Sequence, residues 1–153
     1  MRLVVQRVAH AAVRVGFETV GTIGAGLLVF AGFSPSDGNR QVDWCADKIV
    51  RLRVFGDADG KMNQSVLDVQ GQVLVVSQFT LYASVRRGLR PDFAKAAPPA
   101  LAELLYERFL ERLRQTGLTI ERGRFGAHME VRLINDGPVT LYIDTDEVMS
   151  DGI

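Results

Sequence analysis

The stretch QVLVVSQFTLY, residues 72–82, places four consecutive apolar residues directly before a polar patch. Valine and the other apolar residues at the start of this stretch favour a buried β-strand. A second apolar run, GLLVFAGF at residues 26–33, has glycines near both of its ends. A continuous apolar run of this length is typical of a strand that is covered on both faces. The two stretches therefore predict strands at the centre of a sheet.

Further strands are predicted on both sides of this centre. Residues Leu3–Val15 alternate imperfectly between apolar and polar side chains, and glycines follow at positions 16 and 21. This pattern predicts a strand, a turn near residues 16–18 and a return strand. Two more strands are predicted at Met129–Ile134 and Val139–Ile143, separated by Asn135-Asp136-Gly137-Pro138. Those four residue types all favour turns, so an ordinary hairpin turn is one interpretation of the segment.

Apolar residues recur at helical spacing in two segments, which predict helices near residues 39–52 and 98–117. The second helix ends at Gly117 in this prediction, and its expected buried face is formed by Leu101, Leu104, Leu105, Phe109 and Leu113. Because strands dominate and do not alternate with helices, the predicted fold class is α+β. We expect a single domain, residues 1–153, with a mixed or antiparallel sheet that forms a barrel-like core and two main helices.

The composition is that of an ordinary globular protein, with 47% hydrophobic and 24% charged residues. No apolar run approaches the roughly 20 residues needed to span a bilayer, so no membrane association is expected. The charged N-terminal residues do not resemble a signal peptide, and we expect a cytoplasmic protein. Net charge is +0, so any RNA must be held by local contacts. The single cysteine, Cys45, is interpreted as a small buried residue, not as a metal ligand.

Several common catalytic arrangements are not supported by the sequence. His10 and His128 are the only histidines, and neither has the neighbours of a metal site or a nucleophile elbow. No glycine-rich phosphate loop precedes a predicted helix. We therefore expect no cofactor and no metal. A more promising feature is the polar patch at Ser77, Gln78, Phe79 and Thr80. Burying polar groups costs free energy unless they are hydrogen-bonded, so a polar patch at the end of a buried strand indicates a candidate site. The residue types alone favour the alternative, a strand end whose hydroxyl groups satisfy local backbone atoms.

Two motifs carry a resemblance to a known family. SQFTLYA at residues 77–83 and NDGPVT at residues 135–140 resemble the two signature motifs of the D-aminoacyl-tRNA deacylases. The segments QRV at 6–8, GAGLLV at 24–29 and GKMN at 60–63 also resemble that family, in the same order. So do Arg86-Arg87-Gly88 and Arg90-Pro91. The resemblance covers nearly the whole chain.

The resemblance implies an enzyme that hydrolyses the ester bond of D-aminoacyl-tRNA and releases the D-amino acid and free tRNA. It also implies hydrolysis of glycyl-tRNA mischarged on tRNA-Ala. Ser77, Gln78, Phe79 and Thr80 are then the candidate catalytic residues, with backbone N–H groups near Phe79 and Thr80 stabilising the oxyanion. Thr80 lacks an adjacent base that would make it a nucleophile, so we prefer attack by water, assisted by the 2′-hydroxyl of the terminal ribose.

Stereochemical selection is assigned by the resemblance to Gly137 and Pro138. The resemblance also implies that the protein is a homodimer, in which this Gly-Pro segment of one subunit enters the pocket of the other. A Gly-Pro bond adopts the cis form at modest cost and would exclude an L side chain by backbone contact alone. The sequence does not reveal which isomer is present. An editing enzyme that accepts L-amino acids and a nucleic-acid-binding module without catalysis are the rival hypotheses.

The tRNA end is expected to be held by five further residues. Arg86, Arg87 and Arg90 are the predicted phosphate contacts, with a solvated loop as the alternative. Phe125 and Met129 are predicted to line the pocket, with ordinary core packing as the alternative. Leu89 and Asp92 depart from what the family often has in this loop, and the negative charge of Asp92 weakens the prediction of phosphate contacts.

Overall fold

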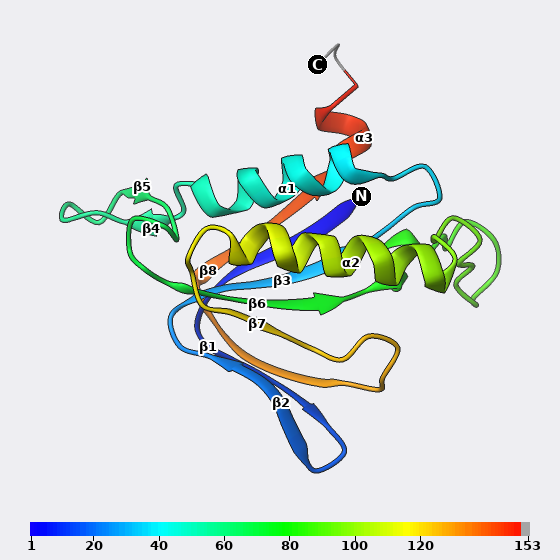
Figure 1. The fold of residues 1–153 in the computed structure, drawn as a ribbon, viewed down its shortest axis with the longest axis horizontal. Coiled ribbons are helices and arrows are strands. Elements are labelled where there is room, and N and C mark those ends of the chain that lie inside the picture. The colour runs from blue at the N-terminus through cyan, green and yellow to red at the C-terminus, as the bar shows by residue number, and fades with distance from the viewer. Residues whose placement is uncertain (151–153) are drawn as a thin grey trace.

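A six-stranded mixed sheet forms the centre of the computed structural model, which describes residues 1–150 (Figure 1). The neighbours along the sheet are β2-β1-β3-β6-β7, and β8 pairs with the remaining edge of β1. The bounds of these strands are β1 Arg2–Val15, β2 Glu18–Ile23, β3 Gly26–Gly32, β6 Gln72–Ser77, β7 Ile120–Arg122 and β8 Glu130–Asp144. The sheet curls into a nearly closed barrel, which confirms the predicted α+β fold class. The last three residues of the predicted 1–153 domain lie outside the described residues.

Strand β3 is the central strand that the sequence predicts. It pairs antiparallel with β1 and parallel with β6. Leu27 and Val29 belong to the large core cluster, whereas Leu28 belongs to a second cluster on the other face of the sheet. Both faces of β3 are therefore covered, which explains why its apolar run is continuous and does not alternate.

Helices α1 (Asn39–Arg51) and α2 (Pro99–Arg114) lie side by side over one face of the sheet (Figure 1). Their apolar faces close the large core cluster, and Cys45 of α1 is fully buried there. Burial raises the pKa of the Cys45 thiol to about 12, so this cysteine is a structural residue. One part of the helix prediction is wrong, because the Leu104 side chain is 68% exposed. Its position on α2 turns it away from the sheet.

The predicted hairpin turn between two C-terminal strands is also wrong. The segment Glu130–Asp144 is one continuous strand, β8, and both of its halves pair with β1. The register shifts where the strand passes Asn135 to Pro138, so the turn-forming residues make a local irregularity instead of reversing the chain. The Asn135 side chain donates to the carbonyl oxygens of Arg7 (3.1 Å) and Val139 (2.9 Å), which bridges the interrupted ladder.

The strand predicted at residues 72–82 ends earlier than expected. β6 stops at Ser77, and Phe79–Tyr82 forms a short 3-10 helix, η1. The close approach of η1 to β3 depends on Gly32, because a Cβ atom there would lie 2.8 Å from the Gln78 carbonyl oxygen. Side-chain propensity favoured a longer strand, but the packing of this turn against β3 overrides it.

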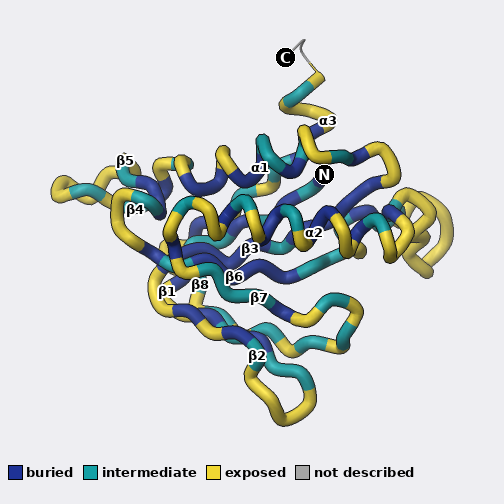
Figure 2. The backbone as a smooth tube through the Cα atoms, viewed as in Figure 1, coloured by how far each residue is buried: buried dark blue, intermediate teal, exposed yellow. Residues whose placement is uncertain are grey.

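Short elements that the sequence did not predict complete the fold. They are β4 Phe55–Gly56, β5 Met62–Gln64, β7 and the C-terminal helix α3 Thr145–Val148. Among residues 1–150, no helix is both long and apolar enough to cross a membrane. Figure 2 shows that buried backbone is concentrated in the central strands and on the inner sides of the helices, whereas the loop after η1 is exposed.

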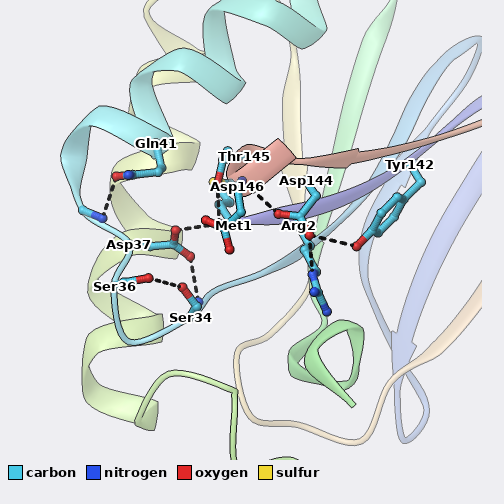
Figure 3. A network of polar contacts seen from close by, with 11 residues as sticks. Met1, Arg2, Ser34, Ser36, Asp37, Gln41, Tyr142, Asp144, Thr145 and Asp146 are labelled. Carbon is cyan, nitrogen blue, oxygen red and sulfur yellow. Dashed lines mark hydrogen bonds and ion pairs between the residues drawn. The ribbon is translucent and has the colours of Figure 1, made fainter. Parts of the chain in front are cut away.

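The N-terminal ammonium group is buried beside α1 and α3 (Figure 3). It lies 2.5 Å from Asp37 Oδ1 and donates to Thr145 Oγ1 at 2.7 Å. The second carboxylate oxygen of Asp37 accepts a hydrogen bond from the Ser34 backbone N–H at 2.7 Å. These contacts therefore connect the start of the chain, just before β1, with the loop that leads into α1 and with the first residue of α3.

Candidate active site

A cavity of about 730 Å³ opens beside the end of β6. Its walls come from the ends of β3 and β6, from η1, from the chain that leads into α2, and from the segment before β8. The lining is mostly apolar, which is typical of a small-molecule site with a few polar groups. The lining residues that the sequence predicted are Ser77, Gln78, Phe79, Phe125 and Met129.

Thr80 stands directly beyond this lining, in η1, and is exposed. Its hydroxyl oxygen accepts a hydrogen bond from the Gln78 side-chain amide. That amide nitrogen is a donor only, so it does not take a proton from the hydroxyl. Within residues 1–150 no carboxylate or imidazole is hydrogen-bonded to Thr80. The arrangement orients the Thr80 hydroxyl and does not activate it.

The backbone of the same turn offers unused hydrogen-bond donors. Gln78 N–H donates to the Ala31 carbonyl (2.8 Å), and Leu81 N–H donates to the Gln78 carbonyl (3.2 Å). Between them, the N–H groups of Phe79 and Thr80 have no acceptor among the described residues. Adjacent free N–H groups beside a cavity match what an oxyanion requires. The geometry is consistent with acyl transfer at this turn.

The Gly137-Pro138 segment does not line this cavity. Its peptide bond is cis, and both residues are exposed on β8. Arg7 holds the preceding residue, because its Nε donates to the Asp136 carbonyl at 3.0 Å while its Nη1 donates to the Val54 carbonyl at 2.6 Å. Gly137 has a φ of +132°, and a Cβ there would lie 2.9 Å from Arg7 Nη2. The two motifs that the sequence singled out are therefore not brought together within one chain.

Comparison with known proteins gives the family. The family model described as D-Tyr-tRNA(Tyr) deacylase matches residues 4–144 of this chain. The chain belongs to this deacylase family. The D-aminoacyl-tRNA deacylase of Thermotoga petrophila is 56% identical over 148 residues, covering 97% of this chain and 99% of the relative. That of Symbiobacterium thermophilum is 56% identical over 147 residues, covering 96% and 97%.

Two solved structures share the deacylase fold. One described as c-Myc DNA Unwinding Element Binding Protein has a TM-score of 0.88 and 46% identity, covering 94% of this chain and 98% of that one. One described as a probable eukaryotic D-amino acid tRNA deacylase has a TM-score of 0.82 and 17% identity, covering 93% and 97%. The predictions of the family and of an enzyme that hydrolyses an aminoacyl-tRNA ester bond are confirmed.

The sequence did not predict all of the residues that line the main cavity. Phe93 makes an edge-to-face contact with Phe79, with ring centroids 5.0 Å apart, and His128 also lies in the lining. The chain around Phe93 has no strong periodicity, so no local signal indicated its position. His128 was noted only as an isolated histidine. It is exposed, and none of the described hydrogen bonds involves its ring.

Met129 packs against Gly123, in the segment that follows β7. A Cβ at Gly123 would lie 2.6 Å from the Met129 sulfur, so a larger residue there would require the Met129 side chain to shift. Phe125 contacts Tyr106 of α2, with ring centroids 5.9 Å apart. Both predicted pocket residues thus line the cavity and pack on the core at once.

The loop that carries Arg86, Arg87 and Arg90 forms a hollow separate from the main cavity. Arg86 and Arg87 line a depression of about 380 Å³, and Ala94 lines both this depression and the main cavity. Arg90 is exposed but lines neither. Asp92 is engaged locally, because its carboxylate accepts from the Ala94 N–H at 2.8 Å. Asp92 also lines the same depression as Arg86 and Arg87, so its negative charge lies beside the predicted phosphate contacts.

Proposed function

We propose that this protein hydrolyses the ester bond of D-aminoacyl-tRNA at the cavity beside η1, releasing the D-amino acid and free tRNA. The observation that carries the proposal is the pair of unengaged N–H groups of Phe79 and Thr80 beside an apolar cavity, in a chain of this family. An aminoacyl ester is already activated, so stabilising its oxyanion supplies much of the catalysis. Such an activity belongs in the cytoplasm, where charged tRNA is used.

Water is the proposed nucleophile. Attack on the carbonyl carbon forms the C–O bond, and the oxyanion accepts from the two N–H groups. Collapse of this intermediate breaks the bond to the ribose oxygen, which takes up a proton as the tRNA leaves. Gln78 offers Thr80 only a hydrogen-bond donor, so no side chain in the described part of the chain accepts a proton from the Thr80 hydroxyl. In this proposal the neighbouring 2′-hydroxyl of the ribose therefore assists the transfer of a proton from the attacking water to the leaving ribose oxygen.

Removing the Thr80 hydroxyl is expected to leave most of the activity. We expect Thr80→Ala to lower kcat on D-tyrosyl-tRNA by less than about 10-fold, because the backbone N–H groups stay in place. Single-turnover kinetics measure this effect, with Thr80→Ser as the control that restores the hydroxyl. Complete loss in Thr80→Ala, together with a trapped acyl-enzyme in the unmodified protein, would instead show that Thr80 is the nucleophile.

Stereochemical selection is proposed to come from Gly137-Pro138 of a second subunit. The segment is exposed and lies outside its own chain's cavity, so it is free to enter another. The outward side of β8 also exposes Ile134 (61%) and Tyr142 (54%), an apolar surface suited to a homodimer contact. A backbone segment that fills the space of an L side chain rejects it whatever its chemistry.

The tRNA end is proposed to lie across both hollows. Arg86 and Arg87 would then contact phosphates while the aminoacylated ribose enters the main cavity, with Arg90 as an outer contact. Phe79, which is 57% exposed, offers a ring on which the terminal adenine can stack. Phe125 and Met129 form the inner wall behind it.

A panel of charged tRNAs tests the function. We expect hydrolysis of D-tyrosyl-tRNA and glycyl-tRNA, including glycine mischarged on tRNA-Ala, but not of L-tyrosyl-tRNA, because backbone exclusion does not reject a hydrogen atom. Release of free tRNA is measured for each substrate, with sedimentation of the same sample for the dimer. Hydrolysis of the L substrate at a comparable rate would favour the L-editing rival. Hydrolysis of none would favour the binding module, a possibility raised by the DNA-binding description of one structural relative.

A further inference from the structure

Arg2 connects the turn η1 with the end of β8. Figure 3 shows its side chain reaching past Asp144 toward that turn. Its Nε donates to Asp144 Oδ2 at 2.8 Å, and its Nη1 donates to the Leu81 carbonyl at 3.0 Å. The guanidinium carbon also lies 4.4 Å from the centroid of the Tyr82 ring. One side chain therefore makes three separate contacts, two of them to η1.

The far end of this connection is itself held in place. Asp144 has a side chain that is only 6% exposed, and it accepts from the Asp146 N–H at 3.0 Å and the Tyr142 hydroxyl at 3.3 Å. Burial favours the neutral acid, but the hydrogen bonds from Arg2 and Asp146 hold the pKa of Asp144 below its usual range. The Asp144 carboxylate is thus a fixed and charged partner for the Arg2 guanidinium.

The unengaged N–H groups lie between two attachment points of the turn. On one side, Gln78 N–H donates to Ala31 of β3 at 2.8 Å. On the other side, Arg2 holds Leu81 and Tyr82. Phe79 and Thr80 are the only residues in between, so the position of their N–H groups depends on both attachments. Catalytic donors must be placed to within about 0.5 Å to be effective.

We propose that Arg2 is a positioning residue for the deacylation site, which it serves by fixing the η1 turn that carries the Phe79 and Thr80 N–H groups. The inference rests on the proposed function of that turn. Arginine suits the task because its planar group donates in two directions while it stacks on an aromatic ring. A lysine at this position has one ammonium group and does not reproduce all three contacts.

Arg2→Met and Arg2→Lys test the role against a matched control. Arg14 lies on the same strand, and its Nη2 donates to Glu130 of β8 at 2.9 Å, far along the ladder from η1. We expect Arg2→Met to lower kcat on D-tyrosyl-tRNA at least about 10-fold with KM within twofold, Arg2→Lys to lose less, and Arg14→Met to stay within twofold. Turnover is measured per folded molecule, with the unfolding midpoint determined separately.

A double-mutant cycle separates this role from a purely structural one. Phe79→Pro lacks one of the N–H groups that Arg2 is proposed to position, so adding Arg2→Met to it is expected to lower kcat clearly less than in the unmodified protein. An unchanged kcat in Arg2→Met, a loss shared by Arg14→Met, or fully additive effects would overturn the role of Arg2. If Phe79→Pro itself behaves like Phe79→Ala, the proposed function of the turn fails, independently of Arg2.

Discussion

Replacing Phe79 by proline is expected to lower kcat about 100- to 1,000-fold relative to Phe79→Ala, the cost of losing one oxyanion donor. Both variants lose the aromatic ring, so the comparison isolates the backbone N–H group. Alanine keeps this donor and proline does not. The contribution of the ring to substrate binding appears in the KM of both variants and cancels between them.

The local structure allows Phe79→Pro to remove the N–H group with little other change to the fold. Phe79 is the first residue of η1, a position whose backbone angle suits proline. Gln78 before it has φ −145° and ψ 80°, which lies outside the α region that a following proline disfavours. Because the Phe79 N–H has no acceptor among the described residues, no hydrogen bond of the fold is lost.

Single-turnover hydrolysis of D-tyrosyl-tRNA measures the difference, and thermal unfolding verifies that both variants are folded. Equal kcat values for the proline and alanine variants would remove the Phe79 N–H from the mechanism. A loss in both variants to the same extent would instead assign the effect to the ring.

Asp37→Asn is expected to lower the free energy of unfolding by about 3–5 kcal/mol, the usual cost of removing one partner of a buried charge pair. The Asp37 side chain is only 1% exposed, and it faces the equally buried Met1 ammonium group. Its two oxygens accept from that ammonium group and from the Ser34 N–H. An amide has one acceptor oxygen, so asparagine leaves one of these donors facing another donor.

Urea unfolding monitored by circular dichroism measures this loss, which corresponds to a fall of roughly 6–20 °C in the thermal midpoint for a chain of this size. Asp47→Asn is the matched control. Its ion pair with Arg112 is 3.2 Å long but half exposed, so its removal is expected to cost at most about 1 kcal/mol. A similar small cost for Asp37→Asn would show that the buried pair contributes little.

Much of the secondary structure follows from periodicity in the chain. The apolar run at Gly26–Gly32 and the helical spacing at Asn39–Arg51 predicted elements that the structure contains at nearly the same residues. The first signal is strong because the run is buried almost without interruption, and the second because burial recurs at the helical period. The errors in the strand boundaries fall at irregular positions, namely the end of β6 at Ser77 and the passage of β8 through Gly137-Pro138.

The residues of the candidate site also divide into those that the sequence predicted and those that it did not. The motifs at residues 77–83 and 135–140 were found in the sequence because the resemblance to the deacylases rests on them. Phe93 and the attachment by Arg2 were not found, because each depends on a partner distant in the chain. Arg2 and Leu81 are separated by 79 residues, and no local pattern encodes such a contact.

The sequence by itself determined the family, the α+β class and the residues of the polar patch from Ser77 to Thr80. Only the tertiary structure decided that this patch passes from the end of β6 into a 3-10 turn with two unengaged N–H groups, and that Gly137-Pro138 lies outside the same chain's cavity. The physical reason is that propensity and periodicity act between near neighbours, whereas the path of β8 and the position of η1 are set by pairing and packing with β1 and β3.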